Sequence, residues 1–256
     1  MINSPPVIIF GNPRSGTRMC ANILNLHPDI CITDEFYNVQ MLSNFANRQI
    51  ASFIENRVDP GTIALRKELL VKSYWIFRSN IKQVEKSFTS KIVGNKTPRS
   101  ENFFDLYEEI FSVNKPIYIY CARNAYDALR SIKNLKNILW GNLPFEEIFE
   151  NYKKSYRIYT KIKKSYPIRT FEINVNMYNE KNAFVHYKQI FDMLGVDYDD
   201  EFIEKVNSLA PQNTLQRVKA ITKDESPIKE LTAEEMKLIS SCKEYAKIKE
   251  SWSFAS

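Results

Sequence analysis

A loop bounded by two glycines, near the start of the sequence, has the spacing of an anion-binding turn. The apolar run Val7–Phe10 leads into Gly11–Arg18 (GNPRSGTR), and residues with helical periodicity follow. Glycines at this spacing let backbone N–H groups and the start of a helix surround a phosphate. In nucleotide triphosphatases a Lys and then a Ser or Thr follow the second glycine, whereas Thr17 and Arg18 stand here. The loop predicts a phosphate-bearing ligand held without a metal; the alternative is a tight strand–helix turn with a surface arginine.

A second polar motif follows the apolar run Ile117–Cys121. Asn124 suits the N-cap of the next helix, and Asp127 stands at the third helical position, where the partner in a capping box belongs. Arg123 then lies at the end of the strand, and Ser131 about two turns into the helix. One phosphate beside this helix would contact both side chains. A capped helix with an exposed arginine explains the same residues without a ligand.

Two further strand ends carry charged residues. Lys96 precedes Thr97 and Pro98, which suit the N-cap and the first position of a helix and leave the lysine on the loop. Asp34 and Glu35 follow another apolar run. A carboxylate in such a place can act as a general base. The alternative is that the two acids only favour the start of the next helix through its dipole.

The elements between these motifs predict an α/β fold, a three-layer sandwich around a central parallel sheet of about five strands. Short apolar runs, each followed by helical periodicity, are typical of buried parallel strands. The runs are Val7–Phe10, Ile30–Ile32, Lys91–Val93, Ile117–Cys121 and Ile168–Ile173. Ligands of open parallel sheets bind beyond the carboxyl ends of the strands. The four charged strand ends are therefore expected to meet at one edge of the sheet.

The rest of the sequence predicts helices. The segment from about 36 to 88 is too long for one crossover and is expected to place two or three helices over the site. The part from about 175 to 256 is expected to be helical, with helices near Asn179–Leu194, Asp199–Leu209 and Thr232–Lys249. Since no repeat or linker marks a boundary, residues 1–256 are expected to form a single domain.

Composition limits the classes of ligand and compartment. Four cysteines without a CxxC pair, together with only two histidines, argue against a zinc site and for reduced thiols. No signal peptide and no apolar stretch of about 20 residues is present, so a cytoplasmic protein without a membrane span is expected. The formal net charge of +6 suits an anionic ligand or a nucleic acid and decides neither.

A strip of cations interleaved with tyrosines supports a different, non-enzymatic hypothesis. A basic face with aromatic side chains can bind RNA through phosphate contacts and base stacking, although most such faces are only solvated. The strip consists of Lys153, Arg157, Lys161 and Lys164, with Tyr152, Tyr156 and Tyr159 between them. We keep RNA binding as an alternative, with nucleic acid the less favoured partner.

The two phosphate motifs together resemble those of sulfotransferases that use 3′-phosphoadenosine 5′-phosphosulfate (PAPS). Pro13–Thr17 (PRSGT) is similar to that family's 5′-phosphosulfate loop, with Arg18 in place of the commoner second Thr. Arg123–Ser131 (RNAYDALRS) is similar to the 3′-phosphate motif R-N-P-x-D-x-x-x-S, with Ala125 in place of Pro. The residues that this resemblance implies for donor binding are Arg14, Ser15, Gly16, Thr17, Arg18, Arg123 and Ser131.

The resemblance implies a metal-independent, in-line transfer of a sulfuryl group from PAPS to an acceptor hydroxyl or amine. In the tyrosylprotein branch a glutamate at the offset of Glu35 is the base, and a lysine at the place of Lys96 acts at the transferring group. Arg14 and Lys96 would then stabilise charge on the departing phosphate. Glu35 would accept the proton, with Asp34 as the second candidate.

Several questions stay open at the level of sequence. The acceptor could be a tyrosyl peptide, a glycan or a small hydroxylated metabolite, bound between the 36–88 helices and residues 134–149, and the oligomeric state is not defined. A P-loop nucleotide kinase without its lysine is an alternative enzyme. The family's S-x-x-W segment has only weak counterparts here, at Thr214–Arg217 or Ser226–Lys229, and neither contains the tryptophan.

Overall fold

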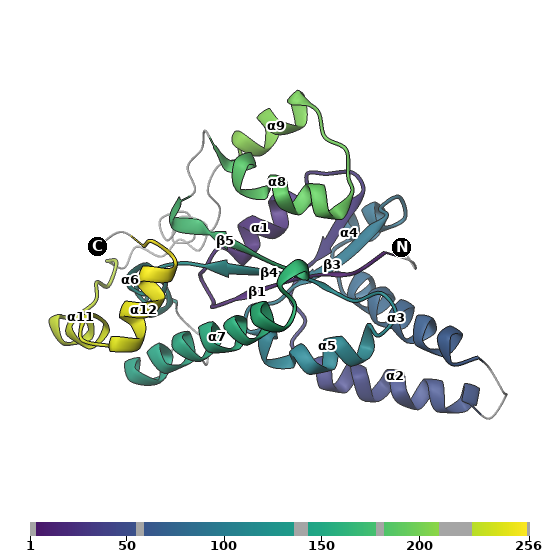
Figure 1. The fold of residues 1–256 in the computed structure, drawn as a ribbon, viewed down its shortest axis with the longest axis horizontal. Coiled ribbons are helices and arrows are strands. Elements are labelled where there is room, and N and C mark those ends of the chain that lie inside the picture. Colours follow the sequence, from purple (N-terminus) through teal and green to yellow (C-terminus); the bar gives the residue numbers. More distant parts are fainter. Residues whose placement is uncertain (1–3, 55–58, 136–142, 178–181, 210–226, 255–256) are drawn as a thin grey trace.

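Five parallel strands form the centre of the molecule. The computed structural model describes residues 4–54, 59–135, 143–177, 182–209 and 227–254. The sheet has the strand order β2-β3-β1-β4-β5, which confirms the predicted α/β fold (Figure 1). The strands are β1 (Val7–Gly11), β2 (Ile30–Thr33), β3 (Ile92–Lys96), β4 (Ile117–Ala122) and β5 (Thr170–Asn174).

The register of the sheet brings the predicted strand ends together. β1 lies at the centre, with Ile9 opposite Lys96 of β3 and Gly11 opposite Cys121 of β4. β1 and β4 are buried along their whole length, because helices cover both faces of the sheet. The last strand begins at Thr170 rather than at Ile168 as predicted, since Pro167–Arg169 forms a 3₁₀ turn instead.

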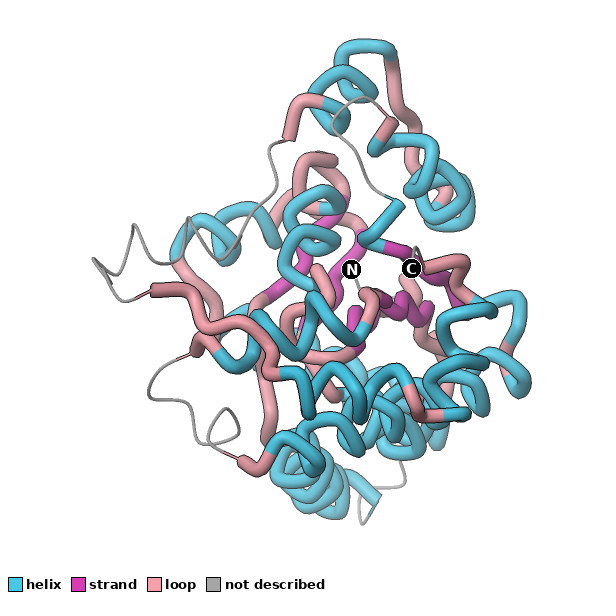
Figure 2. Tube along the Cα trace, turned by 90° about the vertical axis from the view of Figure 1, so that its left-hand side faces the viewer, coloured by secondary structure: helices cyan, strands magenta, loops and turns pink. Residues whose placement is uncertain are grey.

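Helices cover the two faces unequally (Figures 1 and 2). One face packs against α1 (Thr17–Leu24), α8 (Ala183–Leu194) and α9 (Asp200–Asn207). The other face holds the larger core, to which α2, α3, α5, α6, α7 and α12 contribute. The helices on this second face that connect β3 to β5 are α5 (Phe104–Ile110), α6 (Ala125–Lys133) and α7 (Phe145–Ser165). Alternate residues along β1 face opposite cores: Ile8 and Phe10 on one side, Val7 and Ile9 on the other.

The predicted insertion between β2 and β3 is helical. It consists of α2 (Val39–Ile54), α3 (Pro60–Phe77) and α4 (Ile81–Ser87). Trp75 of α3 is buried against Phe111, which anchors the insertion to the core. Among the described residues no helix is both long enough and apolar enough to cross a membrane.

The C-terminal segment is helical but differs from the prediction. The single helix expected over Thr232–Lys249 is two helices, α11 (Ala233–Ser240) and α12 (Lys243–Ser251). The chain turns at Ser241–Cys242, and this turn lets α12 bring its apolar side onto the core beside α7. α12 thereby supports the start of α6, where the Tyr245 hydroxyl accepts a hydrogen bond from the Ala125 N–H (3.1 Å).

Candidate functional site

The glycine loop is shaped by two close approaches of the backbone. Gly11 has φ 140°, and a Cβ there would lie 2.4 Å from the Cys121 carbonyl oxygen. Gly16 has φ 84°, and its Cβ would lie 2.5 Å from Val175 Cγ2. Only glycine accepts both the backbone angles and the lack of space, so the two glycines fix the path of the loop around its centre.

The interior of the loop is suited to an anion. The Ser15 side chain is 1% exposed, and its hydroxyl has no hydrogen-bond partner among the described residues. α1 starts directly after Gly16 and carries no acidic residue in its first turn. Its N–H groups and helix dipole therefore meet no intrahelical negative charge. A buried hydroxyl and an uncompensated helix start are what a phosphate would satisfy.

The second motif contacts the loop directly. Arg14 Nε donates a hydrogen bond to Ser131 Oγ (2.8 Å), and Arg123 Nη1 donates to the Arg14 carbonyl oxygen (3.1 Å). The Tyr152 hydroxyl of α7 donates to the Arg123 carbonyl oxygen (2.7 Å). Residues 117 positions apart in sequence therefore share one site, and α7 holds the end of β4 in place.

The start of α6 follows the predicted cap. The Asn124 side chain accepts a hydrogen bond from the Asp127 N–H (2.8 Å), which confirms Asn124 as N-cap. The Asp127 carboxylate bonds the Asn124 side chain rather than its backbone, because the Asn124 N–H donates to Asn176 Oδ1. The cap places Arg123 at the strand end and Ser131 inside the helix, on the side of the loop.

Guanidinium groups converge on this site. Burial lowers the pKa of Arg14, and the neighbouring cations Arg123 and Arg18 lower it further. Burial also lowers the pKa of Arg123; Asp127 opposes this shift, and Arg130 adds to it. Mutual repulsion among buried cations costs free energy that a bound polyanion would offset. The electrostatics of the site thus favour a multiply charged anion.

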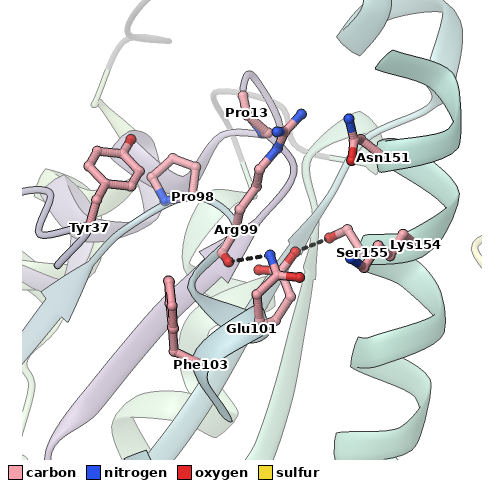
Figure 3. A pocket seen from close by; sticks show the side chains of 10 residues that line it. Pro13, Tyr37, Pro98, Arg99, Glu101, Phe103, Asn151, Lys154 and Ser155 are labelled. Carbon is pink, nitrogen blue, oxygen red and sulfur yellow. Dashed lines mark hydrogen bonds between the residues drawn. The ribbon is translucent and has the colours of Figure 1, made fainter. Parts of the chain in front are cut away.

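A cavity of about 500 Å³ opens beside the loop (Figure 3). Its lining consists of Pro13, Tyr37, Pro98, Arg99, Glu101, Asn102, Phe103, Asn151, Lys154 and Ser155. The helix predicted to start at Thr97 and Pro98 begins later: Arg99 adopts φ 64° and precedes a 3₁₀ turn over Ser100–Phe103. The left-handed residue Arg99 and the 3₁₀ turn that follows it both contribute side chains to the wall of the cavity.

Glu101 is a buried acid in the lining of that cavity. It is 2% exposed; Oε1 accepts a hydrogen bond from the Ser155 hydroxyl, while Oε2 has no partner among the described residues. Burial raises the pKa of Glu101 to about 7, against the opposing effects of Ser155 and Arg99. The pKa of this carboxyl therefore lies close to neutral pH.

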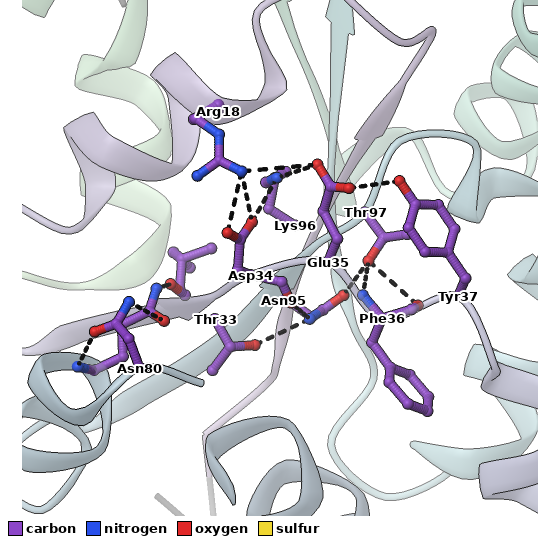
Figure 4. Close-up of polar contacts among 12 residues, drawn as sticks. Arg18, Thr33, Asp34, Glu35, Phe36, Tyr37, Asn80, Asn95, Lys96 and Thr97 are labelled. Atoms are coloured by element: carbon purple, nitrogen blue, oxygen red, sulfur yellow. Dashed lines mark hydrogen bonds and ion pairs between the residues drawn. The ribbon is translucent and has the colours of Figure 1, made fainter. Parts of the chain in front are cut away.

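The predicted catalytic pair, Lys96 and Glu35, forms one network with three further side chains (Figure 4). Lys96 Nζ lies 2.6 Å from Glu35 Oε1 and 2.7 Å from Asp34 Oδ1, and its side chain is only 2% exposed. Arg18 contacts Asp34 at 3.1 Å and Glu35 at 4.0 Å. The Tyr37 hydroxyl donates to Glu35 Oε2 (2.6 Å). The buried lysine thus fixes both candidate bases at the edge of the loop.

Charges from Lys96 and Arg18 also set the ionisation of Asp34. Burial alone would raise the pKa of Asp34, but the attraction of Lys96, its hydrogen bond and the charge of Arg18 together lower it. Asp34 is therefore held as a carboxylate and serves as a counter-charge for both cations. Within the part of the chain that the structure describes, Glu35 is the one of the two acids that is bonded to a hydroxyl, that of Tyr37.

The structure brings every sequence-predicted site residue to one edge of the sheet, and adds residues that the sequence did not indicate. Arg18, predicted only for donor binding, also pairs with Asp34. Tyr37, Arg99, Glu101 and Tyr152 were missed. Arg99 follows Pro98 at a strand end and could have been found from that position. Glu101 could not, because nothing in its local sequence indicates that it is buried.

Other sequence predictions fall outside the site. On α7, Arg157 pairs with Glu150 and Glu244, and Lys153 pairs with Glu150, so part of the basic strip is already engaged with acids. No three His, Cys, Asp or Glu side chains within the described ranges are grouped as metal ligands. Thr214–Arg217, Ser226 and residues 136–142 of the 134–149 segment lie outside the described residues.

Comparison with known proteins decides the family. A family model described as "Sulfotransferase family" matches residues 5–200. The chain belongs to the sulfotransferase family. The match contains the glycine loop, the Lys96–Glu35 network and the Arg123–Ser131 motif. A search of the curated proteins gives no match.

Solved structures share the fold at low identity. The sulfotransferase domain of the Synechococcus PCC 7002 olefin synthase has a TM-score of 0.57 and 14% identity, covering 99% of this chain and 96% of that one. The sulfotransferase domain of the curacin biosynthetic pathway has a TM-score of 0.51 and 18% identity, covering 98% of each chain. At these identities the likeness establishes the sulfotransferase fold.

Proposed function

We propose that this sulfotransferase takes a sulfuryl group from PAPS and transfers it to the hydroxyl or amine of an acceptor. The observation that carries the proposal is the direct contact between the two phosphate motifs, Arg14 to Ser131 and Arg123 to Arg14. PAPS bears a phosphosulfate at one end and a 3′-phosphate at the other. Adjacent cationic subsites on two strand ends suit such a ligand better than a single phosphate.

The loop fits the phosphosulfate end. The Ser15 hydroxyl, which has no hydrogen-bond partner among the described residues, and the start of α1 offer donors to it. A side chain at Gly11 would clash with Cys121, and one at Gly16 would clash with Val175. Arg123 and Ser131 would hold the 3′-phosphate, and Arg14 lies between the two groups. The repulsion among the arginines would be relieved by the charges of the donor.

The Lys96 network supplies the chemistry. The acceptor oxygen forms a bond to sulfur while the bond between sulfur and the phosphate oxygen breaks, and the acceptor proton passes to Glu35. Lys96 and Arg14 would stabilise the negative charge that grows on the departing phosphate. Lys96 contacts Glu35 Oε1, so Oε2 would take the acceptor proton, with the acceptor replacing the Tyr37 hydroxyl that donates to this oxygen.

The two alternatives have less support. A nucleotide kinase would need a lysine and a magnesium-binding hydroxyl after Gly16, where Thr17 and Arg18 stand, and Arg18 is paired with Asp34. RNA binding along α7 would need a basic strip, yet Arg157 and Lys153 are paired with glutamates. The family match favours sulfuryl transfer over both.

Titration calorimetry with adenosine 3′,5′-bisphosphate, the desulfated donor, tests the proposal. Arg14→Ala and Arg123→Ala should each weaken binding about 10- to 100-fold, since each removes a charged hydrogen-bond donor. Arg157→Ala, a surface arginine on α7, is the matched control and should bind as the unmodified chain does. Normal binding by both site variants would refute the donor site.

A further inference from the structure

The cavity beside the loop extends from the catalytic network toward α7. Tyr37, which bonds the proposed base Glu35, and Pro13 of the glycine loop form one part of its wall. Asn151, Lys154 and Ser155 of α7 form the part contributed by that helix (Figure 3). A volume of about 500 Å³ lies within the range of small-molecule sites. A molecule in this cavity would therefore lie between α7 and Tyr37, the hydrogen-bond partner of Glu35.

We propose that the cavity binds the acceptor and that the acceptor is a small hydroxy acid; this inference rests on the proposed function. Its hydroxyl would face Glu35, an apolar body would lie on the cavity wall, and a carboxylate would end between Arg99, Lys154 and Glu101. Arg99 and Glu101 would then determine specificity together with Lys154.

The lining of the cavity matches the three parts of such a molecule. Pro13, Pro98, Tyr37 and Phe103 give an apolar wall for the body. Two cations, the half-buried Arg99 and the exposed Lys154, also line the cavity. A carboxylate would meet opposite charge there, whereas an acceptor that carries an ammonium group would meet like charge.

Glu101 provides a second, independent sign of a polar ligand. Its Oε2 is buried without a partner among the described residues, and a buried polar atom of this kind costs free energy unless something pairs with it. When protonated, Glu101 can donate a hydrogen bond to a ligand carboxylate while Oε1 keeps its bond from Ser155. When ionised, it would repel that carboxylate.

Burial favours the protonated form of Glu101, whereas its hydrogen bonds from Ser155 and from the backbone of Gly11 and Glu101 favour the ionised form. From its own segment Arg99 attracts the ionised form, while the neutral Ser155 of α7 and the neutral phenols Tyr120 and Tyr107 pack around it. Burial outweighs the one cation, and the pKa rises to about 7. Binding of a carboxylate should therefore weaken as the pH rises through 7.

Matched acid and amide probes test the proposal. The probes are 3-(4-hydroxyphenyl)propionate and 6-hydroxyhexanoate, each compared with its neutral amide, and their dissociation constants are measured by calorimetry on the full chain saturated with adenosine 3′,5′-bisphosphate. At pH 6.5 at least one acid should bind about tenfold more tightly than its amide. From pH 6.5 to pH 8 this preference should fall, and in Glu101→Gln it should stay constant.

Variants on one helix supply the control. Lys154→Gln should weaken binding of the acid about three- to fivefold and leave the amide unchanged, as expected for a partly exposed ion pair. Lys161 is an exposed lysine on the same helix, outside the cavity. Lys161→Gln should change neither the binding of the acid nor that of the amide.

The outcomes separate this inference from the proposed function. If the nucleotide does not bind, the proposed function is wrong and the acceptor inference falls with it. If the nucleotide binds but neither acid is preferred over its amide, or Lys154→Gln matches Lys161→Gln, the hydroxy acid is wrong and the donor site stands. Equal binding of both members of each pair would point to a neutral acceptor.

Discussion

The buried carboxyl of Glu101 should make the stability of the folded chain depend on pH. Its pKa is about 7 in the fold against an ordinary value of 4.5, because burial penalises the ionised form. The folded state therefore binds this proton more tightly than the unfolded state does. Stability from this group is fully present below about pH 4.5, declines as the pH rises through 7, and is constant above that.

The size of the effect follows from the two pKa values. The difference between about 7 and 4.5, at 1.36 kcal/mol for each pH unit, corresponds to about 3 kcal/mol. Glu101→Gln keeps the shape of the side chain and is neutral at every pH. Relative to the unmodified chain, the variant should therefore gain up to about 3 kcal/mol of stability between pH 5 and pH 8.

Urea unfolding at pH 5, 6, 7 and 8 measures this difference. Other titrating groups contribute equally to both proteins and cancel in the comparison. Glu109→Gln is the control: Lys67 lowers the pKa of Glu109 at the surface, so the difference between that variant and the unmodified chain should be flat over the same range. A flat difference for Glu101→Gln as well would show that its carboxyl is ionised throughout, and the electrostatics derived for the cavity would be wrong.

Four further substitutions test the site and its supports. Lys96→Met should lower kcat by a factor of about 100 or more without weakening nucleotide binding to the same degree, and an unchanged kcat would exclude Lys96 from the transfer step. Glu35→Gln should spare nucleotide binding and lower turnover about 10²- to 10⁴-fold in a radiolabelled sulfuryl-transfer assay; full activity would exclude it as the base. Gly16→Ala combines a strained φ with a clash against Val175, so urea unfolding should show a loss of about 1–3 kcal/mol, and no loss would contradict the loop geometry. Tyr245→Phe leaves the first N–H of α6 without its partner, and the same assay should show a loss of about 1–3 kcal/mol unless the helix start moves.

Local sequence signals predicted the strands and the caps well. A short apolar run such as Val7–Phe10 is stable as a strand when helices cover both faces of the sheet. Asn124 has a side chain that can accept the hydrogen bond of an N-cap. The predictions failed where a backbone angle decides the outcome. Pro98 suits a helix start, but Arg99 takes a left-handed conformation and delays the turn to Ser100.

Side-chain partners depended on the strand order, which the sequence does not specify. Lys96 meets Glu35 because β3 lies between β1 and β2, and this neighbourhood exists only in the order found. The burial of Glu101 depends in the same way on α7, which packs over it from more than fifty residues away. The functional residues at a single strand end could thus be predicted from the sequence. The contacts between residues of different strand ends could not, because they depend on the strand order of the folded sheet.

A crystal structure of the chain soaked with adenosine 3′,5′-bisphosphate tests the central claim most directly. Two phosphates should occupy the edge of the sheet: the 5′-phosphate inside the glycine loop near Ser15, and the 3′-phosphate on Arg123 and Ser131, with Arg14 between them. Nucleotide density at any other place, or density that leaves both subsites empty, would contradict the account.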